Sequence, residues 1–191
     1  MTGYEAELDG TRWFVCSSPE LFSPRGLDRG TAPMLRHAGL EAGMKALDLG
    51  CGTGVVGAYA ALRGAEVFLS DVSPEAVETA ARTMAANGVT ARGLYVSDGF
   101  AQIDESGFDL ILCNPPYHAD FAVAKRLIEK GFNRLKLGGR MMLVVKRELW
   151  YRKKLESVFG GARVLREDGY SLLTAERRQL RYAEKPGLRN N

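Results

Sequence analysis

The stretch DLGCGTG, residues 48–54, decides the fold class of this chain. It joins the short apolar segment 45–49, a predicted strand, to the segment 53–62, which is rich in small residues and predicts a helix. Glycines at such a turn adopt positive φ and let a ligand approach the backbone closely. Open parallel sheets bind ligands at the carboxyl ends of their strands. The stretch therefore predicts a strand–turn–helix unit with a binding site at its turn.

Strands and helices alternate along the chain around this unit. A hairpin is predicted over residues 4–16, and a helix follows with Pro33 in its first turn and Gly39 near its end. Further strands are predicted at 66–70, 92–96, 108–113, 140–146, 162–166 and 170–175, and helices at 74–86, 120–136 and 149–159. This alternation predicts an α/β, Rossmann-like fold with a mostly parallel seven-stranded sheet and helices on both faces. The last strand is expected to be antiparallel, because the link 167–169 is too short for a parallel crossover.

Length and composition predict a single domain. The 191 residues can bury a full core. We expect an N-terminal strand or hairpin extension over 1–20, the α/β domain over 21–180 and a disordered tail over 181–191. The chain start does not resemble a signal peptide, and no apolar run approaches the roughly 18 residues of a membrane span. The three cysteines form no CxxC pair, which favours reduced thiols in a cytoplasmic protein without a metal site.

The charge of the chain is unevenly distributed. Residues 1–145 carry 14 Lys/Arg and 17 Asp/Glu, whereas residues 146–191 carry 12 and 6. A basic C-terminal quarter could attract phosphates, although a solvated helix face and tail would explain it as well. Trp150 and Tyr151 could stack on unpaired bases or pack in the core. The cations nearest the expected site are Lys146, Arg147, Arg152, Lys153 and Lys154.

The tetrapeptide NPPY, residues 114–117, follows a predicted central strand directly. Pro115 and Pro116 lack N–H groups and restrict φ, so this loop should be stiff. The Asn114 side-chain oxygen and the Pro115 carbonyl can each accept one hydrogen bond from an exocyclic amino group. Tyr117 can stack on the flat group that carries this nitrogen. The pattern predicts a site that holds a planar amino group.

Both motifs resemble those of known enzymes. DLGCGTG resembles motif I of the class I methyltransferases, and NPPY resembles motif IV of those that act on amino groups. With His118, and with the segment FSPRGLDRGT at 22–31, the chain resembles the "methyltransferase small" family. Within that family it is most similar to the RsmC and RlmG types, which methylate guanine N2 in ribosomal RNA. The resemblance runs from about residue 21 to 178.

The resemblance implies S-adenosylmethionine as cofactor, with S-adenosylhomocysteine as product, and in-line methyl transfer without a metal or covalent intermediate. It places Asp71 at the ribose hydroxyls, Asp98 at the adenine amino group and Asp48 near the ammonium. The remaining cofactor-binding candidates are Gly50, Gly52, Gly54, Val72, Asp28, Thr31 and Asn114. Asp28 and Thr31 are expected to form a lip near the cofactor together with Gly30. The implied catalytic residues are Asn114, Pro115, Pro116, Tyr117 and His118, the last orienting the substrate or relaying a proton.

Four other functions fit parts of the pattern. Release-factor glutamine and adenine-N6 methyltransferases share the NPPY loop. An NAD-dependent oxidoreductase would use Gly52, Gly54 and Gly57, but leaves this loop unexplained. A non-catalytic RNA-binding module need not keep Asp48, Asp71 and Asn114.

RsmC-type enzymes usually carry a second domain ahead of the catalytic one. We therefore expect ribosomal RNA or a ribosomal subunit to dock through the basic C-terminal quarter, a partner or a dimer.

Overall fold

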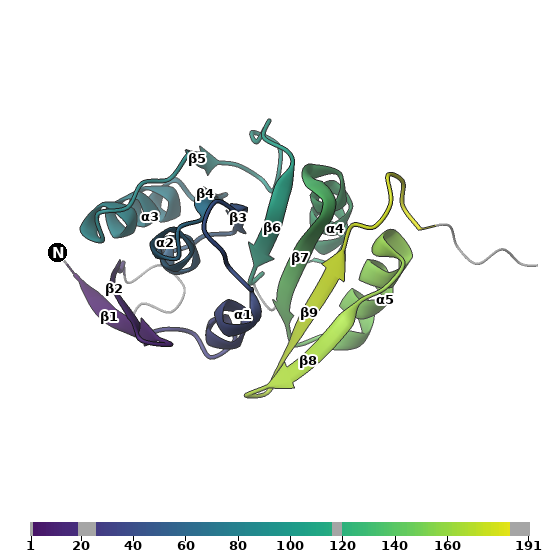
Figure 1. Cartoon of the computed structure of the whole chain (residues 1–191), viewed down its shortest axis with the longest axis horizontal. Helices are drawn as coiled ribbons and strands as arrows, with labels where there is room; N and C mark the ends of the chain where they lie inside the picture. The colour runs from purple at the N-terminus through teal and green to yellow at the C-terminus, as the bar shows by residue number, and fades with distance from the viewer. Residues whose placement is uncertain (1, 19–25, 116–119, 184–191) are drawn as a thin grey trace, which may run out of the picture.

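A seven-stranded sheet forms the centre of the molecule (Figure 1). The computed structural model describes residues 2–18, 26–115 and 120–183. The strand order is β5-β4-β3-β6-β7-β9-β8, in which β3 to β7 are parallel and β9 is antiparallel to both its neighbours. This confirms the predicted sheet and its antiparallel last strand. The strands are β3 (Lys45–Leu49), β4 (Glu66–Asp71), β5 (Gly93–Val96), β6 (Phe108–Cys113), β7 (Leu135–Val145), β8 (Arg163–Glu167) and β9 (Tyr170–Glu176).

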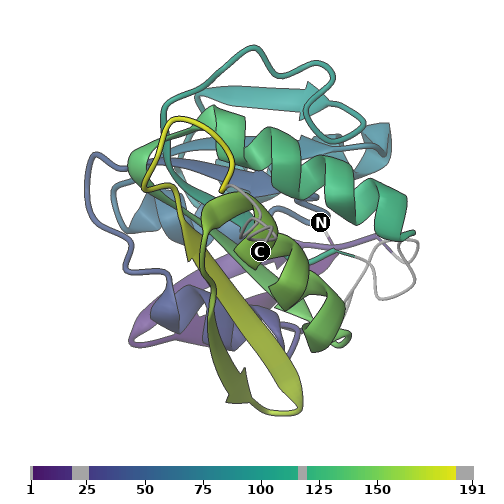
Figure 2. The same cartoon turned by 90° about the vertical axis from the view of Figure 1, so that its right-hand side faces the viewer.

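Helices cover both faces of the sheet, and successive residues of the central strands point to opposite sides. In β3, Ala46 packs into one hydrophobic cluster and Leu47 into the other. The first cluster lies under α1 (Thr31–His37), α2 (Val55–Leu62) and α3 (Pro74–Ala86), and the second under α4 (Phe121–Arg134) and α5 (Glu148–Phe159). Figure 2 shows α4 and α5 side by side. Within the described ranges, no helix has the length and apolar character needed to cross a bilayer.

The junction between α4 and β7 differs from the prediction. The helix ends at Arg134, and the strand begins with Leu135 rather than residue 140. Gly138 adopts a φ of 80° and donates its N–H to the Arg177 carbonyl at 2.8 Å, while Gly139 accepts from the Arg177 N–H at 2.8 Å. The two glycines, which are typical of a loop, are therefore paired with the chain just after β9.

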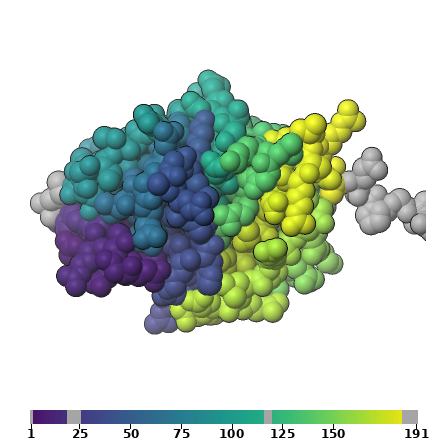
Figure 3. All heavy atoms as spheres, in the orientation of Figure 1, coloured from purple at the N-terminus to yellow at the C-terminus, as the bar shows by residue number. Residues whose placement is uncertain are grey.

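An N-terminal hairpin, β1 (Gly3–Leu8) and β2 (Thr11–Cys16), packs against α2 and α3. Figure 3 shows it in purple beside the teal residues of α3. Its inward side chains Ala6, Leu8, Trp13 and Val15 are buried in the same hydrophobic cluster as α1 to α3. The hairpin is thus part of this core, and the predicted division at residues 20 and 180 remains a prediction.

Thr83 of α3 connects the hairpin to the glycine-rich loop. This fully buried side chain donates to the Thr53 carbonyl at 2.7 Å and accepts from the Cys16 N–H at 3.0 Å. Asn87 strengthens the same junction, since its side chain accepts from the Phe14 N–H at 2.9 Å and donates to the Phe14 carbonyl at 2.7 Å. The loop after β3 therefore has its outer side fixed by α3 and β2.

Replacing Thr83 with valine keeps the shape of the side chain but removes both hydrogen bonds. Two buried backbone groups then lose their partners, and we expect the free energy of unfolding to fall by about 1–3 kcal/mol. Denaturant titration measures this loss. Ser157→Ala, which removes an exposed hydrogen bond to the Lys154 carbonyl, is the matched control and should change stability by less than about 0.5 kcal/mol. Equal effects of the two substitutions would contradict the proposed anchoring.

Candidate active site

The carboxyl ends of four adjacent parallel strands place the predicted site residues along one edge of the sheet. The order β5-β4-β3-β6 puts Asp98, Asp71, the loop 50–54 and Asn114 at successive strand ends. Asp48 lies opposite Leu69 of β4 and Leu112 of β6. The predicted clustering of these residues therefore follows from the strand register.

The glycine-rich loop turns back over the end of β4. The N–H groups of Gly50 and Cys51 both donate to the Ser70 carbonyl, at 2.8 and 2.9 Å. Gly50, Gly52 and Gly54 have φ values of 78°, 51° and 76°, a region that favours glycine. A Cβ on Gly54 would lie 2.7 Å from Ala80 Cα in α3, whereas a Cβ on Gly50 or Gly52 would meet nothing within 4 Å. Gly54 thus permits helix packing, and the other two leave open space above the loop.

Asp48 is a buried carboxylate beneath this loop. Its side chain is 6% exposed and accepts the Gly57 N–H at 2.9 Å. Burial raises its pKa to about 7, against the effect of the Gly57 hydrogen bond, and the nearby charge of Asp71 adds to the rise. No lysine or arginine in the described ranges forms an ion pair with either acid. A cationic ligand would stabilise the ionised form of Asp48 and is therefore favoured at this site.

Asp71, at the end of β4, orders the loop from the other side. Its Oδ2 accepts the Gly52 N–H at 2.9 Å and its Oδ1 accepts the Ser73 N–H at 3.0 Å. Each carboxylate oxygen has a second lone pair for a ligand hydroxyl. The adjacent Val72 is 69% exposed, which leaves an apolar surface beside the acid. Asp98 is exposed at the next strand end, with Oδ2 3.6 Å from the Arg126 guanidinium.

Asn114 is held in one orientation by two residues at the start of α1, Asp28 just before the helix and Thr31 in its first turn. Its Nδ2 donates to Asp28 Oδ2 and to Thr31 Oγ1, both at 3.1 Å. The Asp28 carboxylate also accepts the N–H groups of Gly30 and Thr31, at 2.9 and 3.1 Å. Because an ionised carboxylate can only accept, the Asn114 NH₂ group must face Asp28. The side-chain oxygen of Asn114 is therefore directed away from Asp28 and Thr31.

Close packing fixes the start of α1 over the sheet. A Cβ on Gly30 would lie 2.5 Å from Val144 Cγ1 of β7 and 3.0 Å from Tyr170 Cδ1 of β9. Only glycine fits at this approach. The family resemblance implied that Asp28 and Thr31 lie near the cofactor, and the structure adds their direct contact with Asn114. Pro115 is buried next to it, and Pro116, Tyr117 and His118 lie outside the described residues.

Sequence reasoning missed Tyr4 of the hairpin. This half-buried phenol is hydrogen-bonded to the Thr53 side chain and lies close enough to Asp28 for its charge to act on it. Burial raises the pKa of Tyr4 to about 12, so the phenol stays protonated at neutral pH. The alternation in β1 shows that Tyr4 faces inward with Ala6 and Leu8, but no local signal connects it to a loop about 50 residues later.

The basic residues expected at the rim are in different environments. Lys154 pairs with Glu129 at 2.5 Å and Arg152 lies 3.7 Å from Glu156, whereas Lys146, Arg147 and Lys153 are exposed. Tyr151 is 6% exposed and packs in the core. Trp150 is only partly buried, so the two aromatic residues have different environments.

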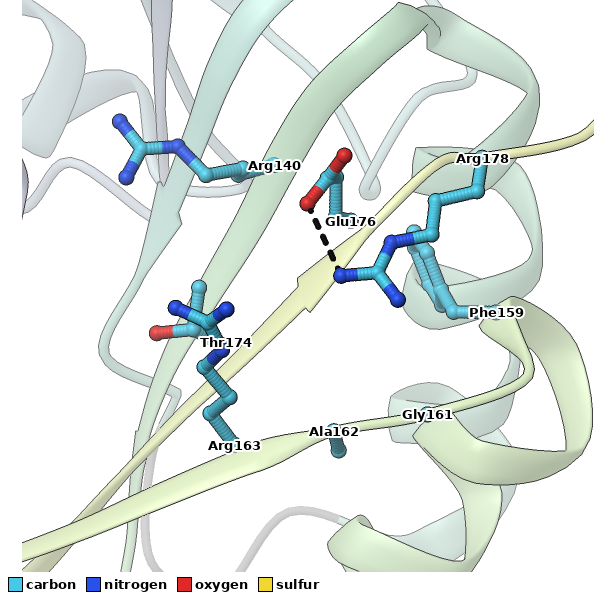
Figure 4. A pocket seen from close by; sticks show the side chains of 8 residues that line it. All are labelled: Arg140, Phe159, Gly161, Ala162, Arg163, Thr174, Glu176 and Arg178. Atoms are coloured by element: carbon cyan, nitrogen blue, oxygen red, sulfur yellow. Dashed lines mark hydrogen bonds and ion pairs between the residues drawn. The ribbon is translucent and has the colours of Figure 1, made fainter.

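A pocket away from this site lies over β7, β8 and β9 (Figure 4). It is lined by Arg140, Phe159, Gly161, Ala162, Arg163, Thr174, Glu176 and Arg178. Arg163 begins β8 and Glu176 ends the antiparallel β9, so this pocket lies toward the opposite edge of the sheet from Asn114. It contains none of the predicted site residues.

Known proteins share both the sequence and the fold of this chain. Ribosomal RNA small subunit methyltransferase C of Chromohalobacter salexigens is 39% identical over 160 residues, which cover 80% of this chain and 47% of that protein. Ribosomal RNA large subunit methyltransferase G of Klebsiella pneumoniae is 32% identical over 166 residues, covering 82% and 44%. The chain thus spans about half the length of the curated relatives it matches.

A solved structure extends the similarity to three dimensions. The 16S rRNA guanine-N2 methyltransferase RsmC of T. thermophilus, in complex with AdoMet and guanosine, superimposes with a TM-score of 0.84 at 30% identity. The superposition covers 92% of this chain and 50% of RsmC. The family model of the methyltransferase small domain matches residues 12–174, which include the glycine-rich loop, both acids beneath it and Asn114. This chain therefore belongs to the methyltransferase small domain family.

Proposed function

We propose that this chain transfers the methyl group of S-adenosylmethionine to the N2 amino group of guanine in ribosomal RNA. The observation that carries the proposal is the fixed orientation of Asn114, which turns its side-chain oxygen away from Asp28 and Thr31. The sequence and fold similarity to rRNA methyltransferases C and G and to RsmC supports the choice of substrate. A ribosomal RNA substrate also agrees with the cytoplasmic location predicted from the sequence.

The described residues fit S-adenosylmethionine. When bound, this cofactor supplies an electrophilic methyl group on a positively charged sulfur. Asp48 and Asp71 form no ion pair with a lysine or arginine of the described residues, so they can balance the charge of a cationic ligand. In this proposal Asp48 is the acid nearer the ammonium of the cofactor. The open space above Gly50 and Gly52 allows close approach to the backbone. The free lone pairs of Asp71 can accept the ribose hydroxyls, and the exposed Val72 can pack on adenine, with Asp98 at the adenine amino group.

The role of Asn114 is to position the nitrogen that is methylated. The Asn114 oxygen accepts one N–H of the exocyclic amino group, and the Pro115 carbonyl accepts the other. The nitrogen lone pair then points at the methyl carbon. The new N–C bond forms as the S–C bond breaks, and the nitrogen releases one proton to water. Catalysis by positioning and desolvation requires no covalent bond to the protein.

Methylation of unmodified ribosomal RNA or ribosomal subunits with labelled S-adenosylmethionine tests this function. After digestion to nucleosides, mass spectrometry should find the label in N2-methylguanosine. Label in N6-methyladenosine would keep the cofactor and contradict the base. Label in glutamine of a protein fraction, with none in RNA, would favour the glutamine methyltransferase alternative.

Variants of Asn114 and its partners test the positioning. Asn114→Ala should lower kcat at least 100-fold, since small misplacement of reacting groups has effects on this order. Asp28→Asn should lower kcat by about tenfold or more, because a neutral amide no longer forces the Asn114 NH₂ group to face it. Thr31→Ser keeps the hydroxyl and serves as the control. Isothermal titration should show largely unchanged affinity for S-adenosylhomocysteine in Asn114→Ala and in the control. A normal kcat for Asp28→Asn would contradict this role.

Burial of Asp48 predicts a pH-dependent stability in the absence of ligand. The folded-state pKa of Asp48, about 7, lies above the ordinary value of 3.8. The protonated side chain therefore makes its full contribution to the free energy of unfolding below pH 4, and this contribution is lost as the pH rises toward 7. Relative to Asp48→Asn, the wild-type free energy of unfolding should fall over this range by on the order of 4 kcal/mol. Saturating S-adenosylmethionine should reduce the difference. Parallel pH profiles of the two proteins would show that Asp48 ionises normally.

A further inference from the structure

An exposed aromatic pair lies on the rim of the candidate site. Phe121 begins α4, and Trp150 lies in the first turn of α5. Their rings are stacked, with centroids 4.5 Å apart and an interplanar angle of 28°. Phe121 is 37% exposed and Trp150 is partly buried. Because α4 follows β6 and α5 follows β7, both helices start at the edge of the sheet where Asn114 lies.

Cations lie beside this pair. The Arg147 guanidinium carbon is 5.2 Å from the centre of the Phe121 ring. Arg147 is exposed, and no carboxylate of the described residues forms an ion pair with it. Lys146 is also exposed, with its Nζ 5.3 Å from the centre of the Tyr170 ring. Leu149, between these cations and Trp150, is 60% exposed. An apolar, positively charged surface of this kind suits a ligand with flat bases and phosphates.

We propose that Phe121, Trp150 and Arg147 bind an unpaired base of the RNA next to the guanine that is methylated. The inference rests on the proposed function and extends it to a second nucleotide. A guanine that enters the active site leaves the base stack, so its neighbour loses a stacking partner. The stacked rings of Phe121 and Trp150 replace that partner, and Arg147 and Lys146 attract the flanking phosphates. The surface formed by Phe121, Trp150 and Arg147, called the platform below, therefore binds single-stranded RNA.

A similar cluster at the other end of α4 provides the comparison. Phe132 packs edge-on against Tyr182, and the Arg177 guanidinium carbon lies 4.8 Å from the centre of the Phe132 ring. Here the ring of Phe132 is fully buried, and the polar groups have partners within the protein: Arg177 donates to the Leu135 carbonyl and the Tyr182 hydroxyl to the Glu129 carbonyl. Phe121 and Phe132 are 11 residues apart along α4, roughly 16 Å, so the two clusters are well separated. Tyr182, itself 40% exposed, is therefore a control for loss of a surface aromatic ring.

Kinetics with ribosomal RNA test the platform. Trp150→Ala and Phe121→Ala should each raise KM for RNA on the order of tenfold, as loss of one stacked base does, with kcat within about twofold of the wild type. Trp150→Phe, which keeps an aromatic ring, should restore most of the affinity, and Tyr182→Ala should leave KM unchanged. Affinity for S-adenosylhomocysteine should stay constant in every variant. A merely structural role would instead lower thermal stability and kcat together, without rescue by phenylalanine.

Fluorescence gives a direct measure of the contact. The only other tryptophan, Trp13, is 1% exposed and packs in the cluster on the opposite face of the sheet. A short single-stranded oligoribonucleotide should therefore quench the emission of Trp150, and Trp150→Phe should remove the quenching. Unchanged emission, wild-type KM in the alanine variants, or quenching by a peptide and not by RNA would overturn the platform. If the wild type methylates guanine in RNA and the alanine variants have the same KM, only this inference is wrong. If the wild type transfers no methyl group to RNA, both the proposed function and this inference are wrong.

Discussion

The parallel pairing of β3 with β4 on one side and with β6 on the other is the constraint on which the site depends. It brings the ends of three strands to the same edge, and with them Asp48, Asp71 and Asn114. These three residues are far apart in the sequence, and each is oriented by a hydrogen bond to another segment of the chain. Gly57 and Gly52 supply backbone N–H groups to the two acids, and Asp28 accepts from Asn114. The sheet thus sets the positions of the three side chains, and hydrogen bonds with the loops and with α2 set their directions.

The electrostatics of this edge also limit its chemistry. Cys51 and Cys113 lie close to the two acids, and burial, followed by the charges of Asp48 and Asp71, raises the pKa of each thiol. Both thiols stay protonated and are poor nucleophiles. The same negative potential that suits a cationic ligand therefore disfavours covalent catalysis by these cysteines. Direct displacement, for which a positioned lone pair is sufficient, agrees with this environment.

Much of the fold could be predicted from the sequence, because strand and helix periodicities and the glycine-rich turn are local signals. The α4–β7 boundary was misplaced because Gly138 and Gly139 look like a loop, and only their bonds to Arg177 continue the strand. The contact of Asn114 with Asp28 joins residues 86 positions apart, and the sequence suggested only that both lie near the cofactor. The roles of Pro116, Tyr117 and His118 remain predictions.

The hairpin has a consequence for how this domain can be combined with others. Its strand β2 is anchored through Thr83 to the carbonyl of Thr53, inside the glycine-rich loop, and its Trp13 packs on Tyr59 of α2 with ring centroids 5.0 Å apart. The region matched by the family model begins within this hairpin, at residue 12. A boundary drawn at the first strand of the large sheet would remove part of the core and one support of the loop. When this domain is fused to another, the hairpin must be kept together with the sheet.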